Sequence, residues 1–135
     1  MKNLLRTLGG EANKPPPIWL MRQAGRHLKE YKTLRKKAKN FLSFCYSSDL
    51  ALEASLQPIQ RYKLDAAIIF SDILVIPDAL GQEVSFVESK GPNLAPIESV
   101  KDIERLSSSN LNNYLKPVYK TITKLAEKVP PETTV

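Results

Sequence analysis

The chain has 135 residues, with 20 Lys and Arg against 14 Asp and Glu, and its formal net charge is +6. This length fits one domain of ordinary globular composition. The single cysteine, Cys45, excludes an internal disulfide and a metal site built from thiolates alone, and it favours a reducing compartment. Apolar runs such as 66–70 are far shorter than the ~20 residues that cross a bilayer, so we expect no membrane span.

The positive charge is concentrated at the start of the chain. Residues 1–44 hold 11 Lys and Arg against 2 Glu, a net +9, whereas residues 45–135 hold 9 Lys and Arg against 12 Asp and Glu, a net −3. A basic segment can attract RNA, an acidic membrane or a substrate with many carboxylates. The run at 35–39 lacks the interleaved aromatic residues of a nucleic-acid stacking surface, so we interpret it as a solvated face and expect no nucleic-acid partner.

The first predicted strand covers residues 18–21. A proline triplet precedes it, and its Ile-Trp-Leu-Met sequence predicts a buried strand with Trp19 in the core. The chain then turns in a loop that contains Gly25. Between residues 31 and 40 the basic residues are too dense to predict more than one or two exposed helical turns.

A helix is predicted from a Ser-Ser-Asp cap at 47–49 to about Tyr62. Its core face is formed by apolar residues spaced at i, i+4 and i+7: Leu52, Leu56 and Ile59. Residues 66–72 then predict a strand that is apolar on both faces until it reaches Ser71 and Asp72. Burial of both faces is typical of a parallel strand covered by helices.

In the second half of the chain, predicted strands and helices continue to alternate. Residues 83–88 predict a hairpin strand, followed by a turn at 89–91. Residues 99–102 fit a capping box at the start of a short helix. Apolar residues recur at helical spacing over 111–129, and residues 133–135 are typical of the start of a strand.

Alternating strands and helices predict an α/β fold with a parallel sheet. A (βα)8 barrel takes roughly 250 residues. We therefore expect residues 1–135 to form one incomplete domain, the N-terminal part of a TIM barrel truncated before closure.

Two groups of residues are candidates for chemistry. Arg22 and Arg26 flank Gly25 directly after the first predicted strand, and two guanidinium groups around a glycine loop favour binding of carboxylate or phosphate. Asp72 ends the second predicted strand, where α/β folds place their ligands. Asp72 has two structural explanations as well, because it could cap the following turn or pair with one of the arginines.

Residues 17–28, Pro-Ile-Trp-Leu-Met-Arg-Gln-Ala-Gly-Arg-His-Leu, closely resemble the N-terminal signature of the uroporphyrinogen decarboxylase family. Further stretches resemble that family in the same order, at 56–59, 65–74, 79–81 and 91–92. The resemblance covers almost the whole chain, and two long matches at the expected distance make it specific. Lys29 departs from the family, in which a proline is usual after the signature.

The resemblance implies a (βα)8-barrel carboxy-lyase of haem biosynthesis. Such an enzyme removes the four acetate carboxyl groups of uroporphyrinogen III, giving coproporphyrinogen III, without a metal or an organic cofactor. It also implies a cytoplasmic homodimer. The family's remaining strands, with a tyrosine, a serine and a histidine of the cleft, would lie beyond Val135, so we expect this chain alone to be inactive.

The resemblance also implies roles for individual residues. Those implied to bind substrate are Arg22, Gln23, Ala24, Gly25, Arg26, Arg35 and Asp72. Of these, Arg22, Arg26 and Asp72 are implied to be catalytic. A carboxylate at Asp72 would stabilise positive charge that develops on a protonated pyrrole ring, and it could accept several pyrrole N–H groups.

Two other readings of the sequence stay open. One is a corrinoid or thiol methyltransferase on the same barrel, whose zinc ligands would come later in the chain. The other is a small basic binding protein without catalysis, which the charge asymmetry alone supports. We expect His27 to have a packing or hydrogen-bonding role and Cys45 to be buried and inert.

Overall fold

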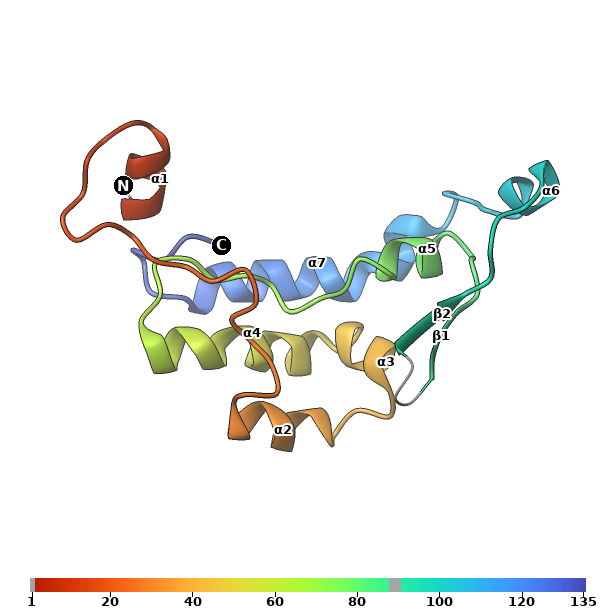
Figure 1. The fold of residues 1–135 in the computed structure, drawn as a ribbon, viewed down its shortest axis with the longest axis horizontal. Helices are drawn as coiled ribbons and strands as arrows, with labels where there is room; N and C mark the ends of the chain where they lie inside the picture. The colour runs from red at the N-terminus through yellow and green to blue at the C-terminus, as the bar shows by residue number, and fades with distance from the viewer. Residues whose placement is uncertain (1, 88–90) are drawn as a thin grey trace.

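The computed structural model describes residues 2–87 and 91–135, which form a mixed α/β chain that is mostly helical (Figure 1). The helices are α1 (Asn3–Leu8), α2 (Lys29–Arg35), α3 (Phe41–Cys45), α4 (Ser48–Tyr62), α5 (Val75–Ala79), α6 (Val100–Glu104) and α7 (Leu111–Lys128). The strands are β1 (Val84–Val87) and β2 (Gly91–Leu94). Among the described residues, no helix has the length and apolar character needed to span a membrane.

Helices α4 and α7 form the centre of the molecule. They lie side by side and run in the same direction, while the chain that follows α4 runs back the other way (Figure 1). One core cluster joins them, with Leu52 and Ile59 from α4 packed with Leu125 from α7. Both long helices predicted from apolar spacing are therefore confirmed.

The bounds of α4 agree with the prediction, but the expected capping hydrogen bond at its start does not form. Ser47 is the N-cap residue, but its side chain accepts no capping hydrogen bond, so the predicted serine cap is wrong. Pro58 lies inside the helix and is buried. The helix ends at Tyr62, as predicted, and the C-cap residue Lys63 has a left-handed φ of 52° and donates its N–H to the carbonyl of Ile59.

Helix α2 is buried along one side, contrary to the prediction of exposed turns. Leu28, Tyr31 and Leu34 are 1%, 6% and 1% exposed and pack with Phe44 and Ala54. These apolar residues recur every third position, so they form one inward stripe while the basic residues between them face solvent. The stripe was not predicted, because the many basic residues of this segment favoured exposed turns.

The predicted strand at 66–72 is wrong as a continuous strand. Ala66 alone forms a bridge, a parallel one with Thr134, in which the Ala67 N–H donates to the Thr134 carbonyl at 2.7 Å. Parallel pairing with the start of the predicted C-terminal strand is thus confirmed at a single position. Two-face burial fails after Ala67, because Ile68 is 37% exposed and residues 69–72 are only half-buried.

The predicted strand at 18–21 is also wrong. Its backbone is extended and contacts the next segment, with the Asp65 N–H donating to the Ile18 carbonyl at 2.9 Å. However, Trp19 is 45% exposed and Met21 is 80% exposed, so Trp19 is not a core residue. An apolar run is buried only where another layer covers it, and the other described residues cover these side chains only in part.

The predicted hairpin strand is confirmed as β1, which pairs antiparallel with β2. The predicted turn at 89–91 lies largely outside the described residues.

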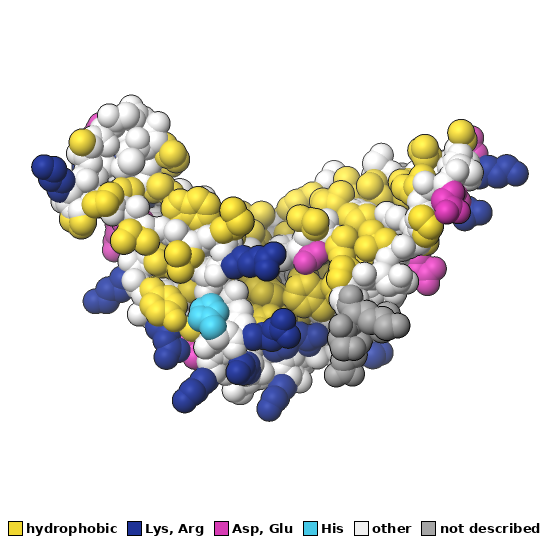
Figure 2. Space-filling model, in the orientation of Figure 1, with side chains coloured by type: hydrophobic (Ala, Val, Ile, Leu, Met, Phe, Trp, Pro, Cys, Tyr) yellow, Lys and Arg dark blue, Asp and Glu magenta, His cyan; other side chains and the backbone are white. Residues whose placement is uncertain are grey.

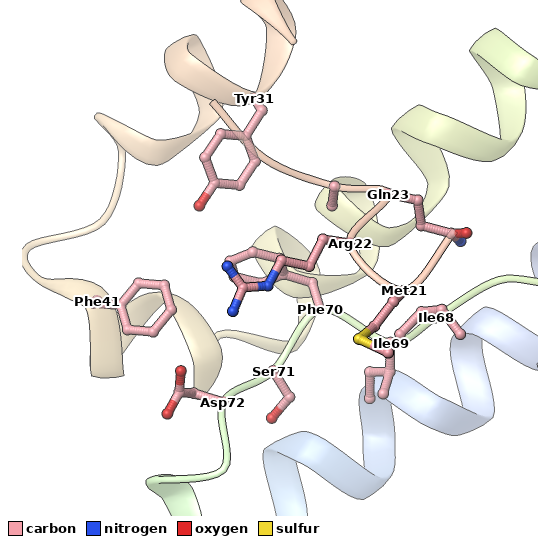
Figure 3. A pocket seen from close by; sticks show the side chains of 11 residues that line it. Met21, Arg22, Gln23, Tyr31, Phe41, Ile68, Ile69, Phe70, Ser71 and Asp72 are labelled. Carbon is pink, nitrogen blue, oxygen red and sulfur yellow. The ribbon is translucent and has the colours of Figure 1, made fainter. Parts of the chain in front are cut away.

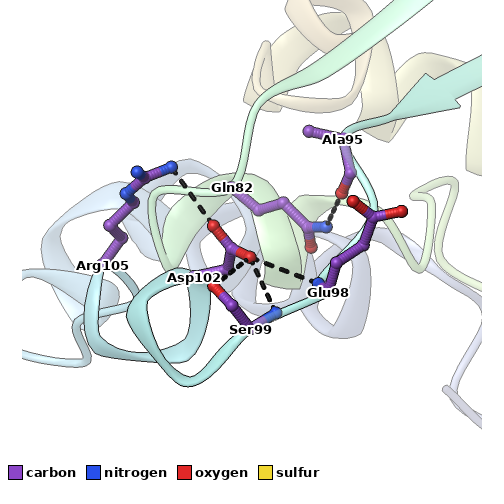
Figure 4. Close-up of polar contacts among 6 residues, drawn as sticks. All are labelled: Gln82, Ala95, Glu98, Ser99, Asp102 and Arg105. Atoms are coloured by element: carbon purple, nitrogen blue, oxygen red, sulfur yellow. Dashed lines mark hydrogen bonds and ion pairs between the residues drawn. The ribbon is translucent and has the colours of Figure 1, made fainter.

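The capping box is confirmed at α6, where the Asp102 carboxylate accepts from the N–H and hydroxyl of Ser99 (Figure 4). These bonds, foremost the one from the Ser99 side chain, lower the pKa of Asp102. Nearby, the Gln82 amide donates to the Ala95 carbonyl at 2.8 Å.

Candidate functional site

A cavity of about 390 Å³ opens between the loop after residue 20, helices α2 and α3, and the segment that leads into α5 (Figure 3). Its volume lies within the range of roughly 300–1,000 Å³ found for ligand pockets. It is lined by Met21, Arg22, Gln23, Ala24, Tyr31, Phe41, Ile68, Ile69, Phe70, Ser71 and Asp72. The cavity therefore joins the two stretches, 21–24 and 68–72, that the sequence analysis singled out separately.

Arg22 is the cation of the cavity. Figure 3 shows its side chain extending from the loop into the space that Tyr31 and Phe41 border. The side chain is exposed, and within residues 2–87 and 91–135 its guanidinium makes no hydrogen bond or ion pair. Its N–H donors are thus available for a carboxylate or phosphate that enters the cavity.

Gln23 holds the loop that carries Arg22. The side chain is 2% exposed, its Nε2 donates to the Ala66 carbonyl at 3.0 Å, and its Oε1 accepts from the Leu20 N–H at 3.3 Å. The buried amide therefore joins the loop to the start of the segment that ends in Asp72. Gln23 lines the cavity, but both of its polar atoms have partners within the protein.

Asp72 is half-buried at the other side of the cavity. Its Oδ1 accepts the Leu74 N–H at 2.8 Å, so the carboxylate closes the turn before α5, as one of the structural explanations anticipated. In the described part of the chain it forms no ion pair with Arg22 or Arg26. Since Oδ1 has one partner and Oδ2 has none among these residues, the carboxylate keeps acceptor capacity for a ligand.

Helices α3 and α5 meet behind Asp72. Cys45 is 1% exposed, as predicted, and burial raises the pKa of its thiol to about 12, with the negative charge of Asp72 adding to the effect. The Tyr46 hydroxyl donates to Asp78 Oδ2 at 2.7 Å. Burial and this hydrogen bond raise the pKa of Tyr46.

The remaining predicted site residues lie outside the cavity lining. Arg26 is exposed. Gly25 takes a φ of 157°, which suits glycine at the turn between the two arginines. Arg35 donates to the Ala38 carbonyl at 3.2 Å and lies 5.8 Å from the ring centre of Phe44, so it stabilises the end of α2. The structure thus brings Arg22 and Asp72 to one cavity and leaves Arg26 and Arg35 outside it.

An aromatic wall, formed by Tyr31, Phe41 and Phe70, was missed by the sequence analysis. The ring centres of Tyr31 and Phe70 lie 5.5 Å apart, and those of Phe41 and Phe70 lie 6.0 Å apart. The three rings come from α2, α3 and the segment before Asp72. The helical spacing of Tyr31 with Leu28 and Leu34 was the one signal that could have indicated it.

Figure 2 shows how charge is distributed around this region. The visible face has a hollow with apolar atoms at its base, and Lys and Arg side chains gather on the part of the surface next to it. This arrangement agrees with the concentration of positive charge in residues 1–44. An anionic ligand would therefore approach a surface of opposite charge.

Comparison with solved structures identifies the fold. A methyltransferase from Methanosarcina mazei matches with a TM-score of 0.71 over 97% of this chain and 39% of that protein, at 20% sequence identity. At this identity the likeness concerns the fold alone. The chain thus has the fold of part of that larger protein.

Sequence relatives then identify the family. The family model described as uroporphyrinogen decarboxylase (URO-D) matches residues 1–135. The uroporphyrinogen decarboxylases of Agrobacterium fabrum and Brucella anthropi are 52% and 53% identical over 134 residues, which are 99% of this chain and 39% of each relative. The chain belongs to the uroporphyrinogen decarboxylase family, and it spans about 39% of the length of these relatives.

Proposed function

We propose that residues 1–135 act as the N-terminal part of a uroporphyrinogen decarboxylase, a carboxy-lyase that converts uroporphyrinogen III to coproporphyrinogen III. The observation that carries the proposal is the meeting of Arg22 and Asp72 at one cavity in a chain of this family. An octa-carboxylate substrate also suits a surface whose first 44 residues have a net charge of +9, from 11 Lys and Arg against 2 Glu.

The proposed architecture is the start of a (βα)8 barrel, as one incomplete domain. Two features support it. Helices α4 and α7 run in the same direction, and the segments that follow them pair in parallel where Ala66 meets Thr134. Parallel neighbours joined through a helix are the repeating unit of such barrels.

In the proposed mechanism, Arg22 binds an acetate or propionate carboxylate at the cavity. Arg26, four residues further along the same loop, binds a second carboxylate farther out. Backbone groups of Gln23, Ala24 and Gly25 contribute along the loop, and Arg35 adds a weaker electrostatic attraction. Guanidinium groups suit this role because their N–H donors match carboxylate geometry.

Asp72 has the proposed electrostatic role. Protonation of a pyrrole carbon makes the ring cationic, and the electrons of the C–CO2 bond can then flow into it. A carboxylate held in place by the Leu74 N–H would stabilise that charge where it develops. It would also accept pyrrole N–H groups and so orient the ring. The proposal requires no metal and no organic cofactor.

The proposal includes a homodimer and a cytoplasmic location, as the family resemblance implies. The chain alone is expected to be inactive. A direct test combines this chain with the remaining part of the Agrobacterium fabrum enzyme, the portion that the match does not cover, and follows coproporphyrinogen formation from uroporphyrinogen. We expect activity from the combination and none from either part alone. Absence of turnover from a stable, well-folded combination would contradict the proposal.

Single substitutions test the proposed roles of Asp72 and Arg22 separately. Asp72→Asn keeps an oxygen for the Leu74 N–H but loses the charge, so we expect turnover to fall by roughly a hundredfold or more. Arg22→Gln should raise KM, because it removes a carboxylate contact. Arg105→Gln, at an exposed arginine of the α6 region, is the control and should leave both turnover and KM unchanged. Full turnover by Asp72→Asn would remove Asp72 from the mechanism.

A further inference from the structure

Ser55 connects the central helix α4 to the cavity wall. Its side chain is fully buried, at 0% exposure. Its hydroxyl donates to the Ala51 carbonyl at 2.7 Å and accepts the backbone N–H of Phe70, also at 2.7 Å. Because the hydroxyl hydrogen of Ser55 points to the Ala51 carbonyl, a lone pair of the hydroxyl oxygen faces the Phe70 N–H.

This contact is unusual because a helix side chain takes the place of a neighbouring strand. Within the described ranges, the Phe70 N–H is the one backbone group of residues 68–71 that has a hydrogen-bond partner. Gln23 holds the chain at Ala66, before this segment, and the turn at Leu74 holds it after. The Ala67 N–H donates to the Thr134 carbonyl, and from residue 68 to residue 71 Ser55 provides the polar anchor.

The segment that Ser55 anchors carries one wall of the cavity. Residues 68–72 all line it, and Asp72 lies two positions after Phe70. In an extended chain, residues two apart point to the same side, so the position of the Phe70 backbone determines where the Asp72 carboxylate stands. Apolar contacts of the Phe70 ring, 4.6 Å from that of Phe44, favour burial of the ring but do not fix the backbone N–H.

We propose that Ser55 is a positioning residue for Asp72, and that its hydroxyl holds the 68–72 segment at the distance from α4 at which the carboxylate faces the cavity. The inference rests on the proposed function for the role of Asp72. The anchoring itself is a separate physical claim. The two can therefore be tested by different measurements.

Thr121 supplies a matched control. It is also 0% exposed and lies in a long helix, and its hydroxyl donates to the carbonyl four residues earlier, that of Pro117, at 2.8 Å. Unlike Ser55, it accepts no hydrogen bond from the cavity wall in the described structure. Thr121→Val and Ser55→Ala thus remove similar buried hydroxyls, and only the second removes the anchor.

The first measurement is amide hydrogen exchange of the 135-residue chain by NMR. In the unmodified chain we expect the Phe70 amide to be protected, and the amides of Ile69 and Ser71, which have no partner in the described structure, to exchange rapidly. Ser55→Ala should speed exchange at Phe70 by roughly tenfold or more, relative to the Leu125 amide as a reporter of global unfolding. It should also shift the Leu74 amide resonance, because the Asp72 carboxylate moves. Thr121→Val should do neither.

The second measurement is binding of uroporphyrin, the fluorescent oxidised form of the proposed substrate. Ser55→Ala should raise Kd by roughly fivefold or more, and Thr121→Val should leave it unchanged at a temperature where both are folded. A Phe70 amide that exchanges as fast as its neighbours in the unmodified chain overturns the inference, even if Ser55→Ala does not fold. Unchanged exchange and unchanged Kd in Ser55→Ala overturn it as well. If the unmodified chain binds no uroporphyrin while Phe70 protection still depends on Ser55, the proposed function fails and the anchor stands.

Discussion

The helical layer and the two extended segments at 18–21 and 68–73 have similarly apolar sequences, but the segments are far more exposed. In the helical layer, Leu125 and Ala54 are fully buried. In the extended segments, Met21 is 80% exposed and Ile73 is 85% exposed. Hydrophobic residues therefore do not specify burial in this chain. Burial follows where two elements meet, as α4 and α7 do.

The two regions also differ in which groups form hydrogen bonds with their backbone N–H and C=O groups. Helices α4 and α7 form their hydrogen bonds within their own turns. Residues 18–21 and 68–71 are extended, and an extended chain needs a neighbour for its N–H and C=O groups. The Ile18 carbonyl accepts a backbone N–H, that of Asp65. The N–H groups that have partners donate to side chains: Ile18 to the Asp65 carboxylate at 2.8 Å, Leu20 to Gln23 Oε1 at 3.3 Å and Phe70 to the Ser55 hydroxyl at 2.7 Å. Side chains thus take the place of a neighbouring strand as acceptors for these N–H groups.

The largest expected effect comes from truncating apolar side chains in the two regions. Leu125→Ala should lower the free energy of unfolding by about 2 to 5 kcal/mol, because it leaves a cavity in the cluster between α4 and α7. Ile73→Ala removes a side chain that is 85% exposed and should change it by less than about 0.5 kcal/mol. Urea unfolding of both variants checks the comparison. Equal losses would show that Ile73 is covered in solution.

The next effect concerns pH and the buried thiol behind Asp72. The pKa of Cys45 rises from 9.0 to about 12 in the folded chain, so the unfolded chain loses this proton at a lower pH than the folded chain. The stabilising contribution is therefore present below pH 9.0 and is lost as pH rises toward 12.

Urea unfolding at about pH 8 and about pH 10 measures this effect. The chain should lose more stability between these two values than its Cys45→Ala variant, in which the thiol cannot ionise. The same burial predicts slow reaction of Cys45 with thiol reagents under native conditions. A thiol that reacts as fast as free cysteine would show that the contact between α3 and α5 opens readily.

The smallest effect is at the end of α4. Lys63 has a left-handed φ of 52°, a conformation that glycine adopts at lower cost. Lys63→Gly should raise the free energy of unfolding by about 0.5 to 1 kcal/mol. Lys32→Gly, at an exposed interior position of α2, is the control and should lower it by about 1 kcal/mol. Thermal melts of both variants provide the measurement. If both substitutions changed the free energy of unfolding in the same direction, the prediction would be contradicted.

The candidate site was only partly predictable. Arg22 and Asp72 stood out because Arg22 directly follows an apolar run and Asp72 follows another after one serine. Their meeting at one cavity was not visible in the sequence, since they lie 50 positions apart. The internal hydrogen bonds of Gln23 were not visible either, because a buried amide and a ligand-binding amide have the same residue type.

Local periodicity was enough to predict α4, α7 and the capping box of α6, because each of these depends on residues within a few positions of one another. Family membership was likewise evident from contiguous residues such as 17–28. Tertiary packing decided the rest. It buried α2 despite its charge, exposed Trp19 despite its apolar neighbours, and reduced the strand at 66–72 to one parallel bridge. Strand pairing and burial both depend on distant parts of the chain, so no local pattern can specify them.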